Sequence, residues 1–99
     1  MILVIGTVRL PPANILKAHP AMKTMIAASR AEDGCLDYAY SGDLVEPGLI
    51  RVTEVWRDRE ALAAHFQTPH MAAWRAVFAE LGITERRLAL YEAGEPEPI

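Results

Sequence analysis

The sequence is poor in cysteine, in basic charge and in long apolar runs. Its single cysteine, Cys35, cannot form an intramolecular disulfide or a thiolate cluster for a metal ion. Ten Lys and Arg against thirteen Asp and Glu give a net charge of -3, so the field of the protein repels nucleic acid and anionic lipid. The apolar opening, residues 1–6, is too short for a membrane span and lacks the basic flank of a signal peptide. We therefore expect a cytoplasmic protein with no nucleic-acid and no membrane partner.

The rest of the composition is typical of one small globular domain. Hydrophobic residues make up 52% of the chain and charged residues 23%, which is not the balance of a disordered protein. A chain of 99 residues is long enough to bury one modest core. We expect a single domain over residues 1–92, followed by a flexible acidic tail over residues 93–99.

The hydrophobic pattern predicts four strands and an intervening helix. Apolar, β-prone runs predict strands over residues 2–10, 35–41, 49–56 and 83–91. Asn14 is a plausible N-cap, and the helical stripe that follows it ends at the predicted left-handed stop at Gly34. Pro20 lies inside this stripe, so the helix is either kinked there or regular only after it.

A second helical region lies between the third and fourth predicted strands. Asp58 is a predicted N-cap, and Thr68–Pro69 restarts a helix in the favoured order of cap and proline, with Gly82 as its stop. The resulting order β-α-β-β-α-β predicts an α+β fold, a ferredoxin-like split βαβ sandwich with one antiparallel sheet and helices on one face.

One face of such a sheet is left uncovered by its own helices. Both faces of the second and third predicted strands carry large apolar residues: Tyr38, Tyr40, Leu49, Ile50, Val52, Val55 and Trp56. Because an exposed apolar sheet face is unfavourable in water, the pattern predicts a partner for this face, and we expect a homodimer.

His65 is the leading candidate for chemistry. It shares one side of its predicted helix with Leu62 and Phe66, so its ring should point inward, between helix and sheet. An imidazole with a pKa near 6.5 suits a general base at neutral pH. The structural alternative is a histidine that is hydrogen-bonded to a backbone carbonyl or to Glu54.

Glu54 alternates with Ile50, Val52 and Trp56 on a strand face that we expect to be buried. A buried carboxylate needs a partner. It either pairs with an arginine or histidine for structural reasons, or orients His65 and raises the basicity of its ring.

The aromatic residues have two interpretations as well. Trp56 and Trp74 are core residues or flat walls for a planar ligand. Tyr38 and Tyr40 share a strand face and either donate a phenol hydrogen bond to a bound oxygen or, in the favoured interpretation, seal a subunit interface.

The remaining reactive side chains are weaker candidates. His70, in the first turn of a predicted helix, should be exposed and is a second-choice acid or base, and His19 should face solvent. Cys35 has no basic neighbour in the sequence and is expected to be a small buried hydrophobe. No phosphate-binding glycine loop or metal-ligand spacing is present, and the histidines are scattered, so we expect no cofactor and no metal.

Three segments, in this order and at these gaps, resemble one known family. They are Ala31-Glu-Asp-Gly-Cys-Leu-Asp-Tyr38, Glu54-Val-Trp-Arg-Asp-Arg-Glu-Ala-Leu62 and His65-Phe-Gln-Thr-Pro-His-Met71. The chain resembles the antibiotic biosynthesis monooxygenase family, in its quinol-monooxygenase-like branch of dimeric α+β barrels, over roughly residues 2–91. Haem-degrading members of that family carry Asn, Trp and His where this chain has Thr7, His65 and Arg75, which argues against haem degradation.

The resemblance implies oxidation of a small hydroquinone or polyketide-like aromatic by molecular oxygen, without a cofactor. His65 and Glu54 would then be catalytic, and a larger set would contact the substrate: Trp56, Trp74, Thr7, Phe66, His70 and Tyr38. Isomerisation of a small signalling metabolite would use the same base without oxygen. A third possibility is a non-catalytic stress protein that binds small aromatics.

Overall fold

Four antiparallel strands form one sheet in the order β2-β3-β1-β4 in the computed structural model, which describes residues 1–99. β1 (Ile2–Arg9) is central and pairs with β3 (Leu49–Trp56) and with β4 (Thr84–Glu92). β2 (Cys35–Gly42) pairs with β3 as a hairpin. This is the strand order of a split βαβ sandwich, so the predicted ferredoxin-like α+β fold is confirmed.

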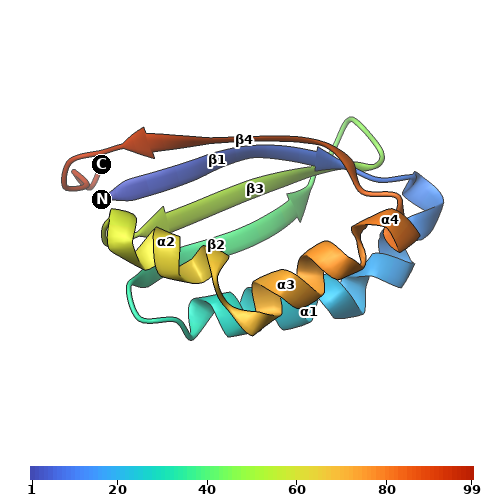
Figure 1. The fold of residues 1–99 in the computed structure, drawn as a ribbon. Coiled ribbons are helices and arrows are strands. Elements are labelled where there is room, and N and C mark those ends of the chain that lie inside the picture. Colours follow the sequence, from blue (N-terminus) through green and yellow to red (C-terminus); the bar gives the residue numbers. More distant parts are fainter.

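The helices all lie on one face of the sheet, and the other face is open (Figure 1). A short 3-10 turn, η1 (Pro12–Asn14), leads into the long helix α1 (Ile15–Arg30). The chain between β3 and β4 forms α2 (Arg59–Phe66), α3 (Pro69–Ala76) and the single turn α4 (Phe78–Leu81). None of these helices is both long enough and apolar enough to cross a membrane.

The predicted caps explain where α2 and α3 begin. The carboxylate of Asp58 accepts a hydrogen bond from the backbone N–H of Ala61 at 2.8 Å. The hydroxyl of Thr68 accepts one from the backbone N–H of Met71 at 3.2 Å, with Pro69 as the first helical residue. Each cap satisfies a backbone N–H that the first turn of its helix leaves without a partner. The region between β3 and β4 therefore contains two separate helices, and His65 and His70 lie on either side of the short break between them.

The structure excludes one of the two alternatives for Pro20 and contradicts the capping role of Asn14. The helix runs through Pro20 without a break, so it is not confined to the residues after the proline. Asn14 occupies the N-cap position, but its side chain caps nothing and instead donates from Nδ2 to the carbonyl oxygen of Leu81 at 2.9 Å. The side-chain amide of Asn14 therefore binds the end of α4 and does not cap the start of α1, as the sequence had predicted.

The core lies between the helices and the inner face of the sheet. Trp56 is fully buried there and Tyr38 is 2% exposed, with Tyr40 beside it on the same face. The interpretation of Tyr38 as an interface residue is therefore wrong, because the helices already cover it. Tyr40 is half-buried on the same face. The apolar side chains that remain on the open face come mainly from β1 and its neighbours: Leu3, Ile5, Val55 and Tyr91.

Candidate functional site

A cavity of about 370 Å³ separates the inner face of the sheet from α2 and α3. Apolar side chains from β1, β3 and β4 form its floor, and aromatic residues form much of its walls. The polar groups in the lining are few, as is usual for small-molecule sites. They are Tyr38, Tyr40, Glu54, His65, Arg75 and Arg86.

His65, near the end of α2, is the histidine in this wall. It is 1% exposed, and its Nδ1 lies 2.6 Å from Oε2 of Glu32. A carboxylate can only accept here, so Nδ1 carries the proton and Nε2 keeps a free lone pair. The protein supplies Nε2 with no hydrogen-bond partner. Burial lowers the pKa of His65, and the adjacent Glu32 opposes that shift only in part, so the ring is neutral at pH 7.

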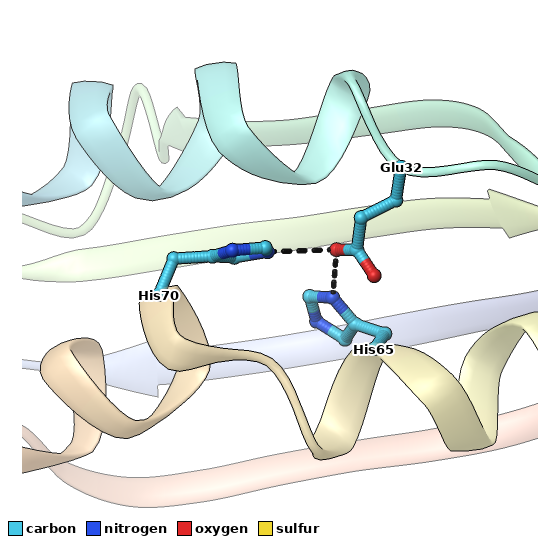
Figure 2. A group of neighbouring side chains, drawn as sticks. All are labelled: Glu32, His65 and His70. Atoms are coloured by element: carbon cyan, nitrogen blue, oxygen red, sulfur yellow. Dashed lines mark hydrogen bonds and ion pairs between the residues drawn. The ribbon is translucent and has the colours of Figure 1, made fainter.

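Glu32 lies in the turn that follows α1, and its side chain is 12% exposed. The same oxygen, Oε2, also accepts a hydrogen bond from Nε2 of His70 at 2.8 Å, as Figure 2 shows. The expectation that His70 is solvent-facing is wrong, because its side chain is 19% exposed and directed at Glu32. Sequence reasoning missed Glu32 as a site residue. No spacing in the sequence signals a contact between residues that follow α1, end α2 and begin α3.

The expectation that the histidines are scattered is also wrong for two of the three. The potential ligand atoms of Glu32, His65 and His70 all lie within 4.8 Å of one another. Two imidazoles and a carboxylate match the donors of catalytic zinc sites. An ion here would displace both N–H protons that now bond to Oε2, so these residues could hold a metal only by giving up the hydrogen bonds that orient His65.

Glu54 does not pair with His65, which corrects the suggested role of this carboxylate as the partner of the histidine. Its Oε1 accepts a hydrogen bond from Nε1 of Trp56, two residues along the same strand face, at 2.9 Å. Glu54 is 5% exposed, as the alternation on β3 predicts. Burial raises its pKa to about 6, against the opposing effects of the Trp56 hydrogen bond and the Arg86 charge.

The tyrosines and Trp74 form an aromatic wall. The hydroxyls of Tyr38 and Tyr40 are 2.7 Å apart, and Tyr40 stacks on Trp74 with ring centroids 5.8 Å apart at 28°. Burial raises the pKa of Tyr40 to about 12 and that of Tyr38 further, so both phenols stay protonated. Phe66, 45% exposed, completes the lining on the α2 side.

Three residues predicted to contact substrate do not line the cavity. Trp56 is buried behind it, with its ring 4.7 Å from that of His65, and Thr7 projects toward the open face of β1. His70 reaches the site only through Glu32. Outside the cavity, Cys35 is half-buried and packs against the core, and burial raises the pKa of its thiol, which makes it a poor nucleophile.

The chain is thus a small α+β protein, a split βαβ sandwich with an apolar cavity between sheet and helices and a buried histidine in the wall of that cavity. The family model for antibiotic biosynthesis monooxygenases matches residues 1–77. The chain belongs to the antibiotic biosynthesis monooxygenase family, as its sequence segments suggested.

Two solved structures share the fold, and a further relative is similar in sequence. A solved structure from Deinococcus radiodurans, provisionally assigned as an antibiotic biosynthesis monooxygenase, is 30% identical with a TM-score of 0.91, covering 100% of this chain and 98% of that one. A Bacteroides thetaiotaomicron protein of unknown function, described as a possible oxidoreductase, is 32% identical with a TM-score of 0.83, covering 93% and 96%. An uncharacterised Synechocystis protein is 30% identical over 99% of this chain and 67% of its own length.

Proposed function

We propose that the protein is a cofactor-independent monooxygenase that oxidises a small hydroquinone or related phenol with molecular oxygen. One observation carries the proposal: a buried, neutral histidine has Nδ1 tied to Glu32, while its other nitrogen is unpaired in the wall of an apolar cavity. Family membership supports the reaction class. The base is His65, as the sequence suggested, but its orienting carboxylate is Glu32 in place of Glu54.

The chemistry begins with proton removal. Nε2 of His65 takes a phenolic proton, and Glu32 stabilises the imidazolium that forms. The phenolate is a stronger reductant than the phenol and transfers an electron to oxygen, and the apolar walls keep water from the resulting radical pair. Superoxide and the aryloxyl radical combine at a ring carbon, and the imidazolium returns its proton to the peroxide that forms. The O–O bond then breaks as water leaves, and the ring carbon becomes a carbonyl. Overall, one hydroquinone and one oxygen molecule give one hydroxyquinone and one water. One atom of the oxygen molecule enters each of these two products.

The test is oxygen uptake with a panel of hydroquinones, for the wild type and His65→Gln. A general base predicts a loss of roughly 10²- to 10⁴-fold in turnover per folded molecule, with melting temperature checked in parallel. His19→Gln is the matched control because His19 is exposed on α1, outside this cavity. Equal rates for the wild type and His65→Gln would remove His65 from the mechanism. Ligand binding without oxygen uptake would favour the isomerase or binding-protein alternatives.

The functional unit is proposed to be a homodimer joined through the open sheet face. Ile5 and Tyr91 on that face are 46% and 52% exposed, and Leu3 and Val55 lie beside them across the β1 pairings. An apolar sheet face of this kind is stabilised when a second copy covers it.

A further inference from the structure

Two exposed arginines line the cavity without forming a salt bridge. Arg75 comes from α3 and Arg86 from β4, and neither takes part in an ion pair. Four other guanidinium groups contact carboxylates at 2.7–3.3 Å: Arg9, Arg51, Arg57 and Arg59. Arg30 donates to the carbonyl oxygen of Tyr38 and Arg87 forms no ion pair, but neither lines the cavity. Arg75 and Arg86 therefore bring two guanidinium groups that form no ion pair to the one cavity that contains His65.

The other ionisable groups in the lining do not cancel these charges. Glu54 is the only acidic residue among them, and its Oε1 is already engaged by Trp56. His65 is neutral at pH 7, and the tyrosine pair stays protonated. With two guanidinium groups against a single carboxylate, the cavity is net positive at neutral pH, which attracts an anionic ligand.

Arg86 is held in place without being neutralised. Its guanidinium carbon lies 5.2 Å from the centroid of the Phe78 ring, a cation–π arrangement that orients the group but leaves its hydrogen-bond donors free. A planar guanidinium matches a carboxylate better than any other anion-binding side chain, through two parallel hydrogen bonds. The Tyr40–Trp74 stack in the same lining offers a flat surface for an aromatic ring.

We propose that the cavity binds an aromatic compound that carries a carboxylate, which Arg75 and Arg86 hold while the ring lies against Tyr40 and Trp74. The inference rests on the proposed function, since it names the substrate class of that site: a dihydroxybenzoic acid in place of a neutral hydroquinone. The carboxylate fixes the ring so that a phenolic hydroxyl meets Nε2 of His65.

Binding can be measured apart from turnover. We would titrate the intact protein, without oxygen, with 2,5-dihydroxybenzoate and with hydroquinone, following tryptophan fluorescence and heat. The wild type should bind the carboxylate at least about 10-fold more tightly, and added NaCl should weaken that preference. Arg75→Gln and Arg86→Gln should each weaken 2,5-dihydroxybenzoate binding by about 10-fold, and neither should change the affinity for hydroquinone.

Arg59→Gln is the matched control. It removes the same charge from α2, where Arg59 forms an exposed ion pair with Glu92 of β4 outside the cavity. Equal affinity of the wild type for the two ligands, or an equal effect of all three substitutions, would overturn the inference. Turnover of hydroquinone with no carboxylate preference would overturn it and leave the proposed monooxygenase standing. A carboxylate preference with no oxygen uptake would support the anion site and count against the monooxygenase.

Discussion

Glu32 and His65 lie 33 residues apart in the sequence, yet Oε2 of the first is 2.6 Å from Nδ1 of the second. The contact fixes the tautomer of His65 and turns Nε2 away from the carboxylate (Figure 2). A carboxylate–histidine pair of this kind raises the basicity of the ring, which here partly offsets the effect of burial. Glu32 is thus a positioning residue for the proposed base.

Replacing Glu32 by Gln should lower turnover by about 10- to 100-fold, since orienting partners of this kind typically contribute that much. The amide oxygen can still accept from both histidines, but it carries no charge and therefore stabilises the imidazolium of His65 less than the carboxylate does. Steady-state oxygen uptake measures the loss, and a melting curve reports whether the variant is folded.

The histidine on the other side of Glu32 provides the comparison. His70→Gln removes a ring that bonds to Glu32 but does not line the cavity, so turnover should fall less than threefold. A larger loss for His70→Gln than for Glu32→Gln would contradict the positioning role given to Glu32.

The pH dependence of kcat/KM should follow His65. The base must be neutral, and burial places its pKa below the ordinary value near 6.5, so activity should rise with pH below 6.5 and be level at neutrality. A substrate phenol ionises near pH 10, so it does not contribute to this rising limb of the pH profile of kcat/KM. In Glu32→Gln the limb should move to lower pH, because the carboxylate that raises the His65 pKa is gone. A limb that is unmoved in that variant would assign the titration to another group.

The fold was predictable because its signals are local. Alternation along β3 placed Glu54 on the buried face, and the Asp58 and Thr68 caps marked the starts of α2 and α3. Each of these signals involves residues within a few positions of one another, where side-chain chemistry and backbone geometry decide the outcome.

The partners within the site were not predictable in the same way. Glu54 accepts a hydrogen bond from the indole N–H of Trp56 on the same strand face. This neutral partner was not predicted because only charged or histidine partners were considered for the carboxylate. The contact between Glu32 and His65 depends on how the end of α1 packs beside α2, a distance that no sequence period encodes. Alternation along β2 correctly predicted that Tyr38 and Tyr40 lie on the same face of the strand. Which of the two sheet faces the helices cover depends on the packing of the whole domain, so the sequence alone did not predict that Tyr38 is buried.

Glu54 should also affect stability in a pH-dependent way. Its pKa rises from the ordinary value to about 6 on folding, so the folded state favours the protonated form. The stability it contributes is present below about pH 4.5 and is lost as pH rises through 6. Glu54→Gln keeps an acceptor for Trp56 and removes the charge, so relative to the wild type it should gain about 1–2 kcal/mol in unfolding free energy between pH 4.5 and pH 7.5. Urea titrations at the two pH values measure the gain, and a constant difference between the proteins would refute the assignment.

The proposed dimer makes the open sheet face essential for assembly. Ile5 projects from the central strand β1 into the middle of that face, so Ile5→Glu would bury an unpaired charge in the interface and should yield a monomer at micromolar concentration. Leu16→Glu is the control, because Leu16 is 79% exposed on α1, on the opposite side of the sheet, and should leave the dimer intact. Light scattering gives the mass, and the unfolding midpoint of the wild type should rise with protein concentration while that of Ile5→Glu should not. A monomeric wild type with a concentration-independent midpoint would show that the apolar side chains of this face tolerate water without a partner.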